Sequence, residues 1–204
     1  MATNRKTAAA LWLAAATAAA PVSARTSWES DQALAIQQIA KTSLEQRRAR
    51  GVVAGWPRES AAAAARVIDK YGTPDQIETA EVSWFDRAPF ARIDVYRDAP
   101  DPSRPYALRQ LVAYVVHADK WSELKVFDRG VAYDPGLQAL VACSDREDIN
   151  LLALNLADEI VRGEKTSLEA RALFDRTLAL AYAGKSSRLT SKLLFRPQPR
   201  TPGP

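Results

Sequence analysis

The order of hydrophobic periods along the chain constrains its fold more than any other feature of the sequence. Two helical periods come first, three stretches with the two-residue alternation of strands follow, and a hairpin and two more helical periods complete the chain. The expected elements are helices over residues 28–50 and 61–71, separated by a break over 51–58; strands over 81–85, 91–97 and 108–116; a helical stretch over 120–127; a hairpin of strands over 131–133 and 137–143; and two helices that end at Gly163 and Gly184. Because runs of strands precede runs of helices, we expect an α+β domain, with a small mixed or antiparallel sheet of about five strands and two N-terminal and two C-terminal helices packed on it.

Three of these helices carry start signals. Ser60 is expected to cap the second helix, and Ser144 and Thr166 each stand three residues before a glutamate, as in a capping box. The strand over 108–116 is apolar on both faces, so we expect it in the middle of the sheet.

The N-terminal segment has the composition of a secretory signal peptide. Arg5 and Lys6 precede an apolar run over residues 7–20, and small residues follow at 22–24. The run is shorter than the ~20 residues that span a bilayer, and no later apolar stretch reaches that length. We therefore expect residues 1–24 to be removed and the soluble mature chain to lie in the periplasm or the medium.

The net charge of +4 is unevenly distributed. Residues 184–204 contain no Asp or Glu and five basic residues, Lys185, Arg188, Lys192, Arg196 and Arg200. Residues 25–183, the expected single domain, are therefore mildly acidic and lack the basic surface of a nucleic-acid-binding protein. Because the segment 184–204 is rich in Pro and charge, it is predicted to be a disordered tail that makes at most a weak contact with an anionic lipid or wall polymer.

Cys143 and His117 are the only residues of their types. A single cysteine excludes an internal disulfide, so stability must come from packing. The alternation of Leu137, Ala139 and Val141 places Cys143 on the buried face of its strand, where an inert thiol is expected. His117 lies at a strand–helix junction and is expected at the surface. One His and one Cys fall short of a zinc site, so we expect neither a metal nor a cofactor.

Candidate binding residues come from one strand and one helix. Arg92, Asp94 and Tyr96 alternate with apolar residues and share a strand face, which can bind a sugar or a peptide or can simply be solvated. Asn155 interrupts an apolar helical run and is expected to hydrogen-bond a neighbouring loop or a ligand. Asp158 lies opposite the apolar stripe of the same helix and is expected in solvent.

Several stretches of the chain resemble a group of uncharacterised exported bacterial proteins. They are residues 67–75, Trp84, and residues 93–98, 143–145, 150–157 and 160–163. The resemblance covers residues 62 to about 174 and implies an envelope protein, but it supplies no reaction, ligand or catalytic residue. Residues 62–96 also resemble, more faintly, the small outer-membrane-assembly lipoproteins of the SmpA/OmlA type, although no lipid-acceptor cysteine follows the leader.

Two functional classes follow from these observations. The first is a non-catalytic periplasmic binding or envelope-associated domain, whose partner is an unknown envelope component or a small ligand. The alternative is an envelope hydrolase that uses Asp or Glu with Asn150 or Asn155 as an orienting group. The hydrolase requires Asn155, Asp94 and either Asp145 or His117 to converge in one cleft.

Overall fold

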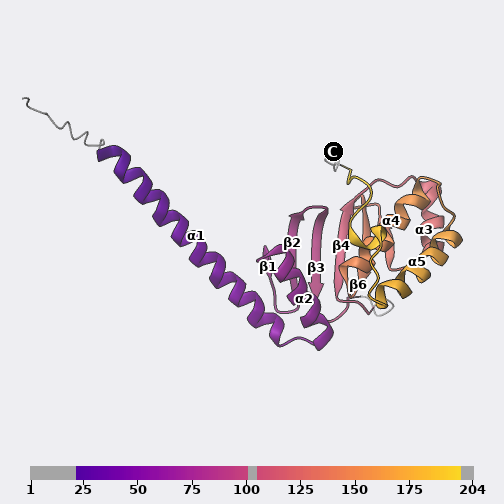
Figure 1. Cartoon of the computed structure of the whole chain (residues 1–204), viewed down its shortest axis with the longest axis horizontal. Helices are drawn as coiled ribbons and strands as arrows, with labels where there is room; N and C mark the ends of the chain where they lie inside the picture. The colour runs from indigo at the N-terminus through magenta and orange to yellow at the C-terminus, as the bar shows by residue number, and fades with distance from the viewer. Residues whose placement is uncertain (1–21, 101–104, 199–204) are drawn as a thin grey trace, which may run out of the picture. The chain divides into compact units, whose positions relative to one another are not determined.

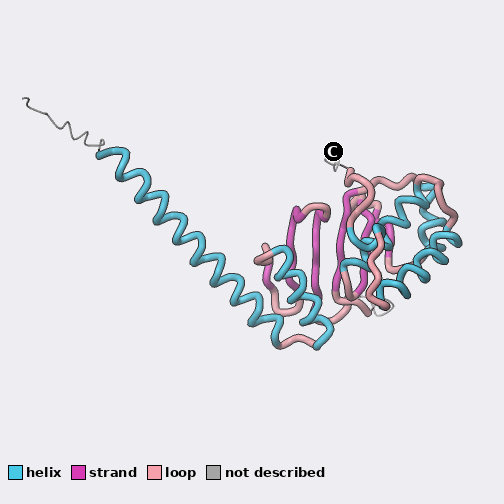
Figure 2. Tube along the Cα trace, viewed as in Figure 1, coloured by secondary structure: helices cyan, strands magenta, loops and turns pink. Residues whose placement is uncertain are grey.

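The structure is a computed structural model that describes residues 22–100 and 105–198 (Figure 1, Figure 2). The chain divides into two compact units, residues 1–41 and residues 42–204. The predicted leader lies almost wholly outside the described residues, so its removal stays a prediction. Within the described part, no helix combines the length and the apolar character needed to cross a membrane.

The first helix, α1 (Val22–Ala54), continues through Gly51, where the sequence predicted a break. That prediction is wrong because Ala49 and Val53, one turn apart, are buried in the core of the second unit. Burial of a valine contributes ~1.5–3 kcal/mol, which exceeds the ~1 kcal/mol that a glycine costs inside a helix. The chain turns only after Ala54, ahead of Pro57.

The second helix, α2 (Arg58–Tyr71), starts two residues earlier than Ser60, which was predicted to cap it. Pro57 occupies the cap position and supplies no side-chain hydrogen bond to the first turn. The Ser60 hydroxyl instead donates to the Arg97 carbonyl at 2.8 Å and ties α2 to the end of a strand.

Within the described ranges, six antiparallel strands form one sheet, which confirms the α+β class (Figure 1, and magenta in Figure 2). They are β1 (Gln76–Ile77), β2 (Glu81–Arg87), β3 (Phe90–Tyr96), β4 (Leu108–Ala113), β5 (Val131–Asp134) and β6 (Ala139–Ser144), in the spatial order β1-β2-β3-β4-β6-β5. The central place of β4 agrees with its apolar faces. The strand absent from the prediction is β1, which at two residues is too short to show a period.

The two faces of the sheet differ. Side chains such as Trp84, Ile93 and Ala142 project into the single buried core, which also contains the buried residues of the helices from α2 to α5. We call this the helix-covered face. The opposite side, which we call the open face, carries a row in register across β2, β3, β4 and β6, formed by Ser83, Asp94, Arg109 and Cys143.

Three helices complete the layer on the helix-covered face: α3 (Trp121–Phe127), which follows a short 3₁₀ turn, α4 (Glu147–Val161) and α5 (Ser167–Tyr182). The capping box of Thr166 and Glu169 at the start of α5 is confirmed. The one predicted for α4 is wrong, because the Ser144 hydroxyl donates to the Arg146 carbonyl and α4 begins without a side-chain cap.

Residues 184–198 are folded, so the prediction of a disordered tail is wrong for this part; residues 199–204 lie outside the described residues. The short helix α6 (Arg188–Ser191) packs on α4. Further along, the Phe195 ring packs edge-on against Tyr114 at a centroid distance of 5.1 Å. The main chain at Gln198 then donates to the carbonyl of Ala113 at 2.8 Å, so the segment ends beside the end of β4.

The covering of α4 also corrects the expectation for Asp158. Only 4% of this residue is exposed, because Tyr114 lies over it and donates its hydroxyl to the carboxylate at 2.7 Å. Arg162 supplies a second donor at 2.9 Å. Burial together with the bond to Asp158 raises the pKa of the Tyr114 hydroxyl.

Candidate functional site

The structure brings the predicted strand residues Arg92, Asp94 and Tyr96 together on the open face. Asp94 was expected on a solvated surface, yet its side chain is completely buried. Its carboxylate accepts a hydrogen bond from the Arg92 Nε at 2.5 Å and one from the Ser83 hydroxyl at 2.8 Å, and the Tyr96 hydroxyl lies 3.5 Å away. Side chains of the neighbouring strands therefore exclude water from the Asp94 carboxylate, which would be solvated if β3 stood alone.

Two further residues complete this arrangement, and the pattern of a single strand predicts neither of them. Glu81 of β2 accepts from Arg92 at 2.9 Å. Arg109 of β4 donates to the Tyr96 hydroxyl at 3.2 Å, and its Nε lies 4.0 Å from the Asp94 carboxylate. The period-two pattern places each residue on a face of its own strand, but only the register between strands brings them together. We call Glu81, Ser83, Arg92, Asp94, Tyr96 and Arg109 the open-face cluster.

The electrostatics of the cluster follow from the burial of Asp94. Burial raises the pKa of the Asp94 carboxyl, and hydrogen bonds from Arg92 and Ser83 offset part of this rise. The bond to Asp94 raises the pKa of the Arg92 guanidinium, and burial raises that of the Tyr96 hydroxyl. With two cations and two anions the cluster is formally balanced, but Asp94 is hidden while both arginines stay partly exposed.

Arg109 retains hydrogen-bonding capacity. Its Nε is buried and makes no hydrogen bond within the described residues, whereas 29% of its side chain is exposed. Arg92, which is 37% exposed, already donates hydrogen bonds to both Asp94 and Glu81. Since Arg109 makes one hydrogen bond within the cluster and Arg92 makes two, the exposed part of the Arg109 guanidinium is the better placed of the two to donate to a new partner.

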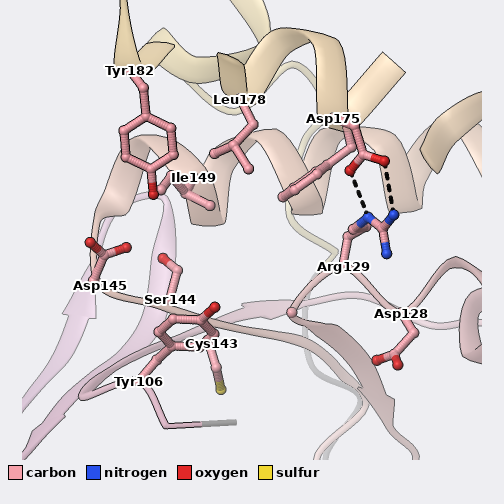
Figure 3. A pocket seen from close by; sticks show the side chains of 12 residues that line it. Tyr106, Asp128, Arg129, Cys143, Ser144, Asp145, Ile149, Asp175, Leu178 and Tyr182 are labelled. Atoms are coloured by element: carbon pink, nitrogen blue, oxygen red, sulfur yellow. Dashed lines mark hydrogen bonds and ion pairs between the residues drawn. The ribbon is translucent and has the colours of Figure 1, made fainter. Parts of the chain in front are cut away.

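A cavity of about 570 Å³ begins beyond Cys143, where the row of the open-face cluster ends (Figure 3). Three carboxylates and two tyrosines lie around it: Asp128, Asp145, Asp175, Tyr106 and Tyr182. In Figure 3 the Tyr182 hydroxyl points from α5 toward the strand end that carries Ser144. The lining is acidic, in contrast to the donor-rich open-face cluster.

One carboxylate of the cavity is neutralised by a guanidinium. Arg129 donates two hydrogen bonds of 2.9 Å to Asp175, drawn as dashed lines in Figure 3. This bidentate contact lowers the pKa of the Asp175 carboxyl. Among the described residues, no group of three or more His, Cys, Asp or Glu is placed to hold a metal ion.

Cys143 does not lie in the core, contrary to the sequence prediction. In β6 the residues that enter the core are Leu140 and Ala142, whereas Cys143 is half-buried and lines the cavity. Residues 139–143 are apolar throughout, so alternation alone does not distinguish the two possible faces.

The residues required for a hydrolase are not brought together. Asn155 lies in α4, on the helix-covered side, where its amide donates to the carbonyls of Leu189 and Lys192 and accepts from the Leu194 N–H. Asp94 lies on the opposite face of the sheet, and His117 is exposed beside the 3₁₀ turn. Of the two roles considered for Asn155, the structure shows the structural one.

The helix-covered side contains a partly buried polar network that the sequence did not reveal. The Glu147 carboxylate accepts from Gln110 at 2.8 Å and from the Tyr71 hydroxyl at 2.9 Å, and it also contacts Lys70. Asn150 donates to Gln110 at 2.9 Å. These bonds join α2, β4 and α4, so the network stabilises the packing of the helices on the sheet.

Comparison with protein-family models, with curated proteins and with solved structures finds no match to this chain. The resemblances noted from the sequence therefore stay predictions.

Proposed function

We propose that this chain is an exported domain of the periplasm or the medium that acts by binding, without a cofactor, and that its ligand contacts the open-face cluster. The observation that carries the proposal is the convergence of Arg92, Tyr96 and Arg109 over a buried carboxylate on the face of the sheet that lies outside the helix-packed core. The export part is supported by the leader-like residues 1–24.

The chemistry of the cluster favours a ligand rich in hydroxyl and carboxylate groups. Guanidinium groups bind carboxylates through several donors at once, and a tyrosine hydroxyl beside them supplies a polar contact with an apolar ring. An envelope polymer built from sugars and acidic peptides carries both kinds of group, as does a small sugar acid or peptide.

The binding proposal is tested by co-sedimentation of the purified protein with isolated cell-wall sacculi, which present sugar and carboxylate groups together. We expect wild-type protein to sediment and the Arg109→Gln variant to lose at least about 80% of the bound fraction. Arg176→Gln, at an exposed arginine of α5, is the matched control and should sediment like wild type.

Two outcomes would contradict the proposal. Either wild-type protein fails to sediment, which excludes this ligand class, or both arginine variants bind equally, which removes the cluster from the contact. An Asp145→Asn variant tests the neighbouring cavity in the same assay, and a loss confined to this variant would assign binding to the cavity instead.

The export proposal has its own test. Edman sequencing of the protein purified from the producing cell should give a first residue near Arg25. Recovery of chains that begin at Met1 from the cytosol would refute export and leave the binding assay unaffected.

A further inference from the structure

A folded segment that carries only positive charge runs over the helix layer. Residues 185–198, which we call the basic strap, include Lys185, Arg188, Lys192 and Arg196 and contain no Asp or Glu. All four of these side chains are exposed. Within the described part of the chain, none of the four forms an ion pair or a side-chain hydrogen bond that would neutralise it.

The strap is held in place by contacts that involve none of its charges. The side chain of Asn155 makes three hydrogen bonds with the main chain of the strap, and their donor–acceptor distances are 2.8–2.9 Å. Leu189, Leu193 and Phe195 pack against the core, and Thr190 is 8% exposed. Folding therefore fixes the main chain and leaves the four cationic side chains in solvent. An ordinary surface segment, by contrast, carries charges of both signs.

The surroundings of α6 add to this positive character. A gap between α2 and α4 that Thr190 and Ser191 help to line is bordered by Arg66, Lys70 and Arg146. The same gap holds two carboxylates, Glu147 and Asp148, each bonded to one of these bases. The surroundings are thus net positive.

We infer that the basic strap docks on an anionic phospholipid surface, as a second contact surface separate from the open-face cluster. Exposed Leu194, between Lys192 and Arg196, suits the boundary between headgroups and acyl chains better than it suits a dissolved polyanion. The strap offers no exposed ring on which a base can stack, because its one aromatic residue, Phe195, packs against Tyr114.

Vesicle flotation with the protein purified from the producing cell tests this inference. Vesicles of phosphatidylglycerol and phosphatidylcholine are compared with vesicles of phosphatidylcholine alone. Each Lys or Arg near an anionic bilayer strengthens the partition of a protein onto it about fivefold. Replacing all four basic residues of the strap by Gln should therefore reduce binding to the anionic vesicles by more than about 100-fold. Raising the salt from 50 to 500 mM should release the wild-type protein in the same way.

The matched control replaces four exposed basic residues outside the strap by Gln, so that its net charge equals that of the strap variant. These residues are Arg47, Arg58, Lys125 and Arg176. This variant should retain binding within about threefold. Both variants alter exposed side chains only, and equal melting temperatures confirm that they fold.

Three results would overturn the inference. One is equal binding to neutral and anionic vesicles, and another is an equal loss in the two four-residue variants. The third is strap-dependent sedimentation with sacculi without any binding to vesicles, which would assign the strap to a wall polymer.

Discussion

Asp94 is a completely buried carboxylate between two partly exposed guanidinium groups. Its removal leaves Arg92 and Arg109 without their shared counter-ion and Ser83 without its acceptor. We expect Asp94→Ala to lower the free energy of unfolding by about 3 kcal/mol, at the lower end of values for broken buried pairs because both arginines reach water. Urea denaturation measures the loss.

The control for this variant is Asp98→Ala, at a carboxylate that is 65% exposed and also paired with an arginine. It should change stability by less than about 0.5 kcal/mol. If both variants cost the same, the burial of Asp94 has no energetic importance.

The same residue gives a pH dependence with a definite sign. Because burial raises the pKa of Asp94 in the folded protein above its unfolded value near ~3.9, the folded state binds this proton more tightly. The contribution of Asp94 to stability is therefore largest in acid and falls as the pH rises from ~4 through the folded pKa. Asp94→Asn should consequently cost more stability at pH 4 than at pH 7, as determined by urea denaturation at both values.

A cost that is larger at pH 7 would reverse this sign. It would show that the hydrogen bonds from Arg92 and Ser83 outweigh burial and lower the pKa of Asp94.

At the scale of elements, the sequence identified five of the six described strands, but of their pairings it predicted only the hairpin of β5 and β6. It placed Arg92, Asp94 and Tyr96 correctly on one face of β3, because two-residue periodicity is a property of a single strand. The burial of Asp94 depends on Arg109, its partner on β4 and fifteen residues away along the chain (109 − 94), and so on a register that no local pattern contains. In β6, a continuous apolar run left both registers open and the predicted face was wrong.

The basic strap shows the same dependence on distant partners. Its basic charges and Pro197 are typical of disorder, and only Leu189, Leu193 and Phe195 provide apolar anchors. Asn155 was recognised as an unusual residue in an apolar helix, but its partners lie more than thirty residues later. Neither Asn155 nor the strap predicts this contact by itself, because its hydrogen bonds join two segments that lie far apart in the sequence.

The attachment of the strap to α4 yields an element-scale prediction. Asn155→Ala removes three hydrogen bonds and leaves the carbonyls of Leu189 and Lys192 without these donors. We expect a loss of about 2–3 kcal/mol in the free energy of unfolding. Hydrogen exchange of residues 185–198 should accelerate more than that of β3 and β4, because these strands exchange only through global opening whereas the strap also opens locally.

The matched control for this prediction is Asn155→Asp, which keeps the acceptor for the Leu194 N–H but loses the two donors. It should release the main chain around Leu189 and Lys192 as the alanine variant does. Unchanged exchange of the strap in both variants would mean that its apolar contacts hold it without Asn155.

At the scale of the whole molecule, the boundary between the two units falls inside one continuous helix. All side chains described between Ser30 and Lys41 are exposed, whereas further along α1 Ala49 and Val53 enter the core of the second unit. The two parts of α1 should thus differ in their importance for stability. A chain that begins at Thr42 should melt within about 2 °C of the longer one.

A chain that begins at Arg58 should behave differently, because it lacks Ala49, Val53 and Trp56, whose indole also donates to the Thr79 carbonyl at 3.0 Å. Loss of the large buried side chains costs about 5 kcal/mol or more, which is comparable to the whole stability of many domains. This truncation should lower the melting temperature by more than about 10 °C or prevent folding. If the shorter truncation, at Thr42, is equally damaging, then residues 1–41 stabilise the second unit, and the exposed part of α1 cannot be a dispensable extension of the fold.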